Sequence, residues 1–209
     1  MAERTPPTPA ELATALGHVA YEVWMCAHVL AMLRELDPSR RPDHLPRWNA
    51  AIESGLIHAR VLAEFLVPND AKKPRTTDMV PSEFVGGWTP EPPDASELLA
   101  QSGAALSQHL AHLTWHRVRA PGGAIDTPVI IEAGVRVGFA WRDHLRVSAS
   151  DLARSEPFQF TMWAASDVLA RMQPGTAGIG PMTTTSGPGI ATTVWSADPS
   201  NGGVRDYPT

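Results

Sequence analysis

The stretch TPAELATALGHVAYEVWMCAHVLAMLRELDP, residues 8–38, decides the fold class. Thr8 and Glu11 have the spacing of a capping box, and a proline stands at the first helical position, where its missing N–H is not needed. Apolar residues then recur every three or four positions until Asp37-Pro38 ends the pattern. The stretch therefore predicts a helix of about 40 Å with one apolar stripe.

Three further segments have apolar residues at helical spacing, about residues 46–67, 94–118 and 157–172. The second of them opens with another capping pattern, with Asp94 as the expected cap. These segments, together with the first helix, supply most of a helical core.

Residues 125–147 fit two patterns. Apolar residues from Val129 to Trp141 alternate as they do in strands, but Asp126-Thr127-Pro128 is a good helix start and a helical stripe is also present. We favour the helix, because the other long helices need a further helix to close their core and a lone hairpin is marginally stable.

Two segments lack periodicity, residues 68–93 and the C-terminal residues 174–209. The first contains Phe84 and Trp88, and large aromatic side chains in a loop typically pin it to the core. The second has five Pro, seven Gly and ten Ser or Thr, so its apolar surface is too small to offset the entropy cost of ordering it. We expect a mainly α fold over residues 8–173, an up-and-down bundle of four or five helices with a long clasp loop, followed by a disordered tail at 174–209.

Composition narrows the function classes. The net charge of −5 gives no sign of a nucleic-acid-binding surface, and the single cysteine, Cys26, cannot form an intramolecular disulfide. The N-terminus lacks the features of a secretory signal, and no stretch approaches about 18 uncharged apolar residues. We therefore expect a cytoplasmic protein without a membrane partner.

Three histidines form a stripe in the third predicted helix. His109, His112 and His116 follow i, i+3, i+7 spacing and fall within about 60° of one another around the helix axis. Such a stripe can be structural, can serve acid–base catalysis, or can bind a metal ion. Because the chain has no HExxH and no Glu-x-x-His pair, we expect neither a metal nor another cofactor.

A second polar group lies in the helix predicted at 46–67. Arg60 and Glu64 have the i, i+4 spacing of a solvated ion pair, and His58 lies beside Leu62 and Phe65, on or near the inward face.

His58-Ala59-Arg60, Phe65-Leu66, Asp78 with Phe84 and Trp88, and His109-Leu110-Ala111-His112-Leu113-Thr114 resemble segments of an uncharacterised family of small bacterial helical proteins. The resemblance covers roughly residues 15–118 and departs at Val61, where an asparagine is expected. It implies a helical fold and a cluster of polar positions but no reaction. The matching positions are His58, Arg60, Phe65, Asp78, Trp88, His109, His112, Thr114 and Arg117.

Two function classes stay open. The first is a non-enzymatic helical module that binds a protein partner or a small ligand, and a homodimer is one form that this module can take. The second is a hydrolase or nuclease with a site between the second and third helices and the 68–93 loop. The chain lacks the pattern typical of HEPN ribonucleases, in which a histidine follows an arginine after four to six residues. In the site we expect, Arg60, Asp78, His109 and His112 meet beneath the loop, with Trp88 as the apolar anchor. The catalytic candidates are His58, Arg60, Asp78, His109, His112 and Arg117.

Overall fold

The computed structural model describes residues 6–36, 41–68, 75, 77–111 and 126–172, which belong to one compact unit, Met1–Met172. The fold is mainly α, as expected, and these residues contain α-helices and no strand. The α-helices are α1 (Pro9–Glu35), α2 (Leu45–Leu66), α3 (Pro93–Ala111), α5 (Thr127–Ser148), α6 (Ser150–Ala153) and α7 (Glu156–Arg171), and the 3-10 helices are η1 (Pro42–His44) and η2 (Pro81–Glu83).

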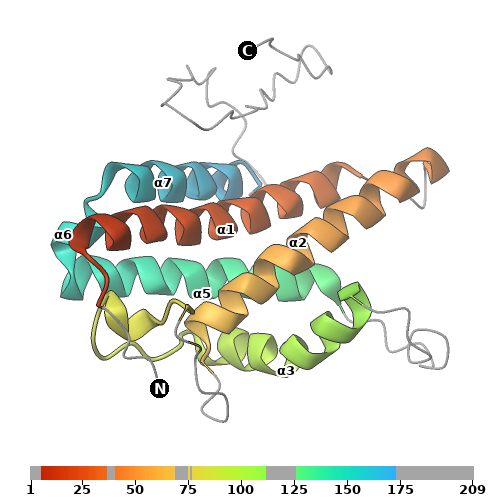
Figure 1. Ribbon diagram of the computed structural model, residues 1–209. Helices are drawn as coiled ribbons and strands as arrows, with labels where there is room; N and C mark the ends of the chain where they lie inside the picture. Colours follow the sequence, from red (N-terminus) through yellow and green to blue (C-terminus); the bar gives the residue numbers. More distant parts are fainter. Residues whose placement is uncertain (1–5, 37–40, 69–74, 76, 112–125, 173–209) are drawn as a thin grey trace. The chain divides into compact units, whose positions relative to one another are not determined.

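Helix α1 begins at the capping box that the sequence predicts. The Thr8 side-chain oxygen accepts the backbone N–H of Glu11 at 3.3 Å, and the Glu11 carboxylate accepts the backbone N–H of Thr8 at 2.7 Å. Two of the N–H groups that a helix start leaves unpaired are thereby satisfied. Helix α1 packs against α7, α2 and α5, and it lies between α7 and α5 while α2 crosses it obliquely (Figure 1).

Helix α5 settles the ambiguity of residues 125–147 in favour of the helix. The members of its helical stripe are all buried, whereas Val129, from the alternating pattern, is 44% exposed. A helix buries this stripe against three partners at once, because α5 packs on α1, α2 and α3. The buried stripe consists of Ile130, Gly134, Val137, Trp141 and Leu145.

The loop before α3 is attached to the core by its aromatic residues. Phe84 is buried and Trp88 is half-buried, and their ring centroids lie 6.3 and 5.1 Å from that of Trp141 in α5. The Trp88 indole N–H also donates a 2.8 Å hydrogen bond to the carbonyl of Leu66, near the end of α2. Both side chains therefore pack as aromatic residues that pin a loop to the core.

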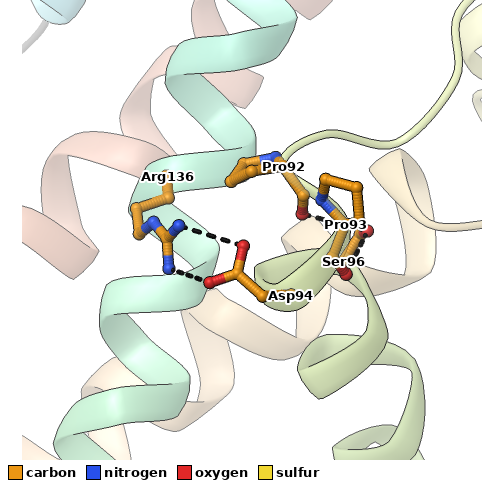
Figure 2. A network of polar contacts seen from close by, with 5 residues as sticks. All are labelled: Pro92, Pro93, Asp94, Ser96 and Arg136. Carbon is orange, nitrogen blue, oxygen red and sulfur yellow. Dashed lines mark hydrogen bonds and ion pairs between the residues drawn. The ribbon is translucent and has the colours of Figure 1, made fainter.

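The start of α3 corrects the capping residue expected from the sequence. The helix begins at Pro93, so Asp94 lies inside its first turn and accepts two hydrogen bonds, of 2.7 and 3.0 Å, from Arg136 of α5 (Figure 2). These bonds lower the pKa of Asp94. The Ser96 hydroxyl bonds instead to carbonyls before and at the helix start, those of Pro92 and Pro93 (Figure 2). The ion pair thus links α3 to α5.

Helix α1 is also long and apolar enough to cross a membrane by length and composition. Glu22 lies in mid-helix, so α1 contains no stretch of about 18 uncharged apolar residues. The core helix of a soluble protein can have the same length and composition, and 44% of the apolar stretch of α1 is buried inside the structure.

Candidate functional site

The most developed polar contact in the described residues joins α1 to α2. His58 Nδ1 lies 2.6 Å from a carboxylate oxygen of Glu22, and the two side chains are only 15% and 19% exposed. A short hydrogen bond to a carboxylate in a partly dry environment is among the stronger polar contacts in proteins. Nδ1 faces the carboxylate, and the other imidazole nitrogen, Nε2, makes no hydrogen bond within the part of the chain that the structure describes.

Aromatic rings extend from this pair along α1. The edge of the Tyr21 ring meets the His58 imidazole at a centroid distance of 5.8 Å, and Tyr21 also lies 6.0 Å from Trp24. One turn later, His28 stacks on Trp24 at 5.6 Å. Burial lowers the pKa of His28 because the charged imidazolium loses its hydration there.

The outer surface around Glu22 and His58 has exposed apolar side chains, and charged side chains of α2, Glu53 and the Arg60–Glu64 pair, lie beside them. Tyr21 on α1 and Ile57 and Val61 on α2 are 37%, 52% and 43% exposed. Ile57 precedes His58, and Val61 follows it by three positions, so both lie on the solvent side of the imidazole. We call the surface formed by Tyr21, Glu22, Ile57, His58 and Val61 the α1–α2 face.

Cys26 lies at the same helix pair but is inert. Its side chain is fully buried and its thiol lies 3.9 Å from the carbonyl of Gly55, at the distance of a weak hydrogen bond. Burial raises the pKa of the thiol far above its ordinary value, so the thiolate that a nucleophile requires does not form. Cys26 is therefore a packing residue.

Arg60 and Asp78, two members of the polar cluster expected beneath the 68–93 loop, are not joined as an ion pair in the part of the chain that the structure describes. Arg60 pairs with Glu64 on its own helix at 2.9 Å, and the Asp78 carboxylate accepts the backbone N–H of Arg75 at 2.8 Å. Each charge has a nearer partner in its own segment, so the Arg60–Asp78 ion pair is absent among the described residues. His112, Thr114 and Arg117 lie outside the described residues, as does the side chain of His109.

His58 has a carboxylate partner, Glu22 of α1. Sequence reasoning missed Glu22 because the two residues are 36 positions apart. One signal was available: Glu22 is the only charged residue in the long apolar run from Leu12 to Leu33. A lone charge on a core helix requires a partner, and a histidine near the inward face of α2 could supply one.

Among the described residues, no group of three His, Cys, Asp or Glu side chains is arranged to hold a metal ion. The expected histidine stripe at 109–116 lies outside the side chains that the structure describes.

Comparison with known protein families, with curated proteins and with solved structures finds no match for this chain. The site is therefore interpreted from its own geometry.

Proposed function

We propose that the chain is a non-enzymatic helical binding module that associates through the α1–α2 face, and that its partner on this face is a second copy of the chain. The observation that carries the proposal is the combination of three exposed apolar side chains with the half-buried Glu22–His58 pair. Apolar surface gathered around a satisfied polar pair is typical of the centre of a protein interface.

Charge favours a second copy as the occupant. In a twofold dimer the same patch lies on both subunits, so residues near the axis meet their own counterparts. An uncompensated charge there would face a like charge. The only carboxylate of the α1–α2 face already bonds to an imidazole, and its other members are uncharged apolar residues or Tyr21. The centre of the face can therefore meet itself without repulsion, although the chain carries a net charge of −5 and the exposed Glu53 lies at the edge, one turn before Ile57.

The composition of α1 supports the same proposal. The helix is long and apolar enough to cross a membrane, yet only 44% of its apolar stretch is buried. A stable interface buries about 800 Å² per partner. Half-buried neighbours such as Trp24 and Met25 extend the apolar surface beyond Tyr21 along α1.

The bundle and its clasp loop belong to this proposal as its scaffold. Contacts of α1 with α2, α5 and α7 support the bundle. The packing of Phe84 and Trp88 on Trp141 supports a loop that clasps α2 and α5. In this role the loop stabilises the helices that carry the α1–α2 face.

A matched pair of valine variants tests the proposal. Val61 lies in the α1–α2 face, whereas Val147, on α5, lies outside it and is 87% exposed. We expect sedimentation equilibrium at about 100 µM to show a dimer for the wild type and for Val147→Glu, since standard interfaces have micromolar or tighter affinity. Val61→Glu should be monomeric and should melt at the temperature of the monomeric wild type measured at low concentration.

Two outcomes would overturn the proposal. One is a wild-type chain that stays monomeric at the highest concentration. The other is a dimer that both glutamate variants weaken equally, because this would place the interface elsewhere.

One observation favours the second candidate function, a histidine-based hydrolase or nuclease. A carboxylate that fixes one imidazole nitrogen leaves the other available as a general base, as Glu22 does for His58. Such an enzyme would work between α1 and α2, whereas the enzyme site expected from the sequence lies between α2, α3 and the 68–93 loop. Hydrolysis of a generic ester or phosphodiester that His58→Gln abolishes, without a change in oligomeric state, would favour the enzyme over the binding module.

A further inference from the structure

A pocket lies where α5, α6 and α7 meet. Its volume is about 280 Å³, and its wall includes Arg142, Arg146, Phe158, Met162 and Trp163. Small-molecule sites commonly measure about 300–1,000 Å³. This pocket, the α5–α7 pocket, lies just below that range, so its size fits a compact organic molecule and not a nucleotide or a peptide.

Arg142 is held in a fixed position at the wall. Two of its guanidinium nitrogens, Nε and Nη2, each lie 2.8 Å from one carboxylate oxygen of Asp143, and Nη1 lies 3.4 Å from the Ser166 hydroxyl. The guanidinium carbon also sits 4.7 Å from the centre of the Phe139 ring. A guanidinium has five N–H groups, and these contacts engage about three of them. A pre-organised cation with spare donors thus faces the pocket.

Arg146 adds a second guanidinium to the same wall, four residues later on α5. It is exposed, and among the described residues no carboxylate pairs with it. Asp143 compensates one of the two arginines, so the pocket carries about one net positive charge. A single carboxylate balances that charge, whereas a dianionic phosphate would leave one negative charge uncompensated.

The remaining wall combines aromatic and apolar side chains with the polar side chains of Gln159 and Ser166. Trp163 is 50% exposed, although indole rings are normally much more buried, and Phe158 and Met162, which also line the pocket, are buried. A flat apolar group would cover the Trp163 ring while its acid group reaches the arginines of α5.

We propose that the α5–α7 pocket binds a small aromatic carboxylate, with the carboxylate on Arg142 and Arg146 and the ring against Trp163. The site uses no residue of the α1–α2 face, so it stands or falls independently of self-association.

Isothermal titration of the full chain with 1-naphthoate tests the site, and uncharged 1-naphthamide serves as the isosteric control. We expect naphthoate to bind with a dissociation constant below about 1 mM, in keeping with the efficiency of small ligands. Naphthamide should bind at least ten-fold more weakly. Raising the salt concentration should weaken naphthoate alone, because the charged contact is partly exposed.

Two matched pairs of variants locate the binding. Arg146→Gln lies in the pocket, whereas Arg154→Gln, on an exposed arginine after α6, lies outside it. Trp163→Ala removes the aromatic wall, whereas Leu45→Ala changes an exposed apolar side chain of α2 that does not line the pocket. We expect Arg146→Gln and Trp163→Ala to weaken naphthoate at least five-fold, and both controls to keep wild-type affinity.

Three results would overturn the proposal. The first is no binding of naphthoate at a concentration ten-fold above the expected dissociation constant, and the second is equal binding of naphthoate and naphthamide. The third is an equal loss of naphthoate affinity in Arg146→Gln and Arg154→Gln. If Trp163→Ala fails to fold, the arginine pair alone decides, because both arginines are exposed and their replacement leaves the core intact.

Discussion

At the residue scale, the pairing of His58 with Glu22 predicts unequal effects for two neighbouring substitutions. His58→Ala leaves the Glu22 carboxylate half-buried without its partner, which should cost about 1–3 kcal/mol of unfolding free energy. Arg60→Ala removes an exposed i, i+4 pair with Glu64 and should cost about 0.5 kcal/mol or less. Urea unfolding of the two variants measures the difference, and similar midpoints would show that the Glu22–His58 bond contributes nothing.

His28 predicts a pH dependence of stability. Its pKa in the folded chain is lowered by burial, so the unfolded chain binds a proton on this side chain more readily. The free energy of unfolding therefore rises with pH where His28 titrates. The stability that neutral His28 contributes is lost as the pH falls below the ordinary histidine pKa of about 6.5. Between pH 7.5 and 5.5 we expect the unfolding free energy to fall less in His28→Gln than in the wild type.

The control for this experiment is His18→Gln, at an exposed position of the same helix, which should keep the wild-type decline. A decline that His28→Gln leaves unchanged would show that His28 does not contribute to it.

Single residues were only partly predictable. The sequence placed His58 near the inward face, and it is half-buried; the Arg60–Glu64 pair was expected and forms. Glu22 was missed because its partner is set by how α1 packs on α2, and spacing within one helix carries no information about a residue on another helix.

At the element scale, two glycines of α5 predict opposite results for the same change. A Cβ at Gly138 would overlap the methyl groups of Val23, a buried and conformationally stiff residue of α1. A Cβ at Gly134 would make ordinary 3.5 Å contacts with Ala59 and Leu62 of α2. Gly138→Ala should therefore cost about 1–3 kcal/mol from overpacking, whereas Gly134→Ala should be neutral or stabilise by up to about 1 kcal/mol through helix propensity.

Thermal melting of both variants checks this pair. If Gly138→Ala melts as high as Gly134→Ala, then α1 and α5 do not approach as closely at Val23 as the structure has them.

Helices were the most predictable level, because their signals are local. The capping box at Thr8 and the stripe that begins at Ile130 depend only on neighbours along the chain, and both match the structure. The start of α3 was wrong by one residue, because Asp94 bonds to Arg136 of another helix instead of capping its own. A tertiary contact overrode the local signal there.

At the scale of the whole molecule, composition and helical spacing predicted the mainly α fold, but not which helices meet. Helix packing depends on close approaches such as that of Gly138 to Val23, which are not visible as a periodic pattern. The α5–α7 pocket was missed for the same reason: Arg142 and Arg146 lie four residues apart on a helix, a common solvated arrangement, and only α7 supplies the aromatic wall.

The central claim is that a second copy of the chain docks on the α1–α2 face, and intermolecular distance tests it most directly. Ala50 is exposed on α2, about two turns before Ile57, and the single native cysteine is buried and should resist labelling. A spin label on Ala50→Cys, one per chain, reports only distances between copies in pulsed electron resonance. We expect a narrow, short distance for Ala50→Cys and a longer one for a label on Val147→Cys. No intermolecular distance at either position, or a shorter one for Val147→Cys, would contradict the account.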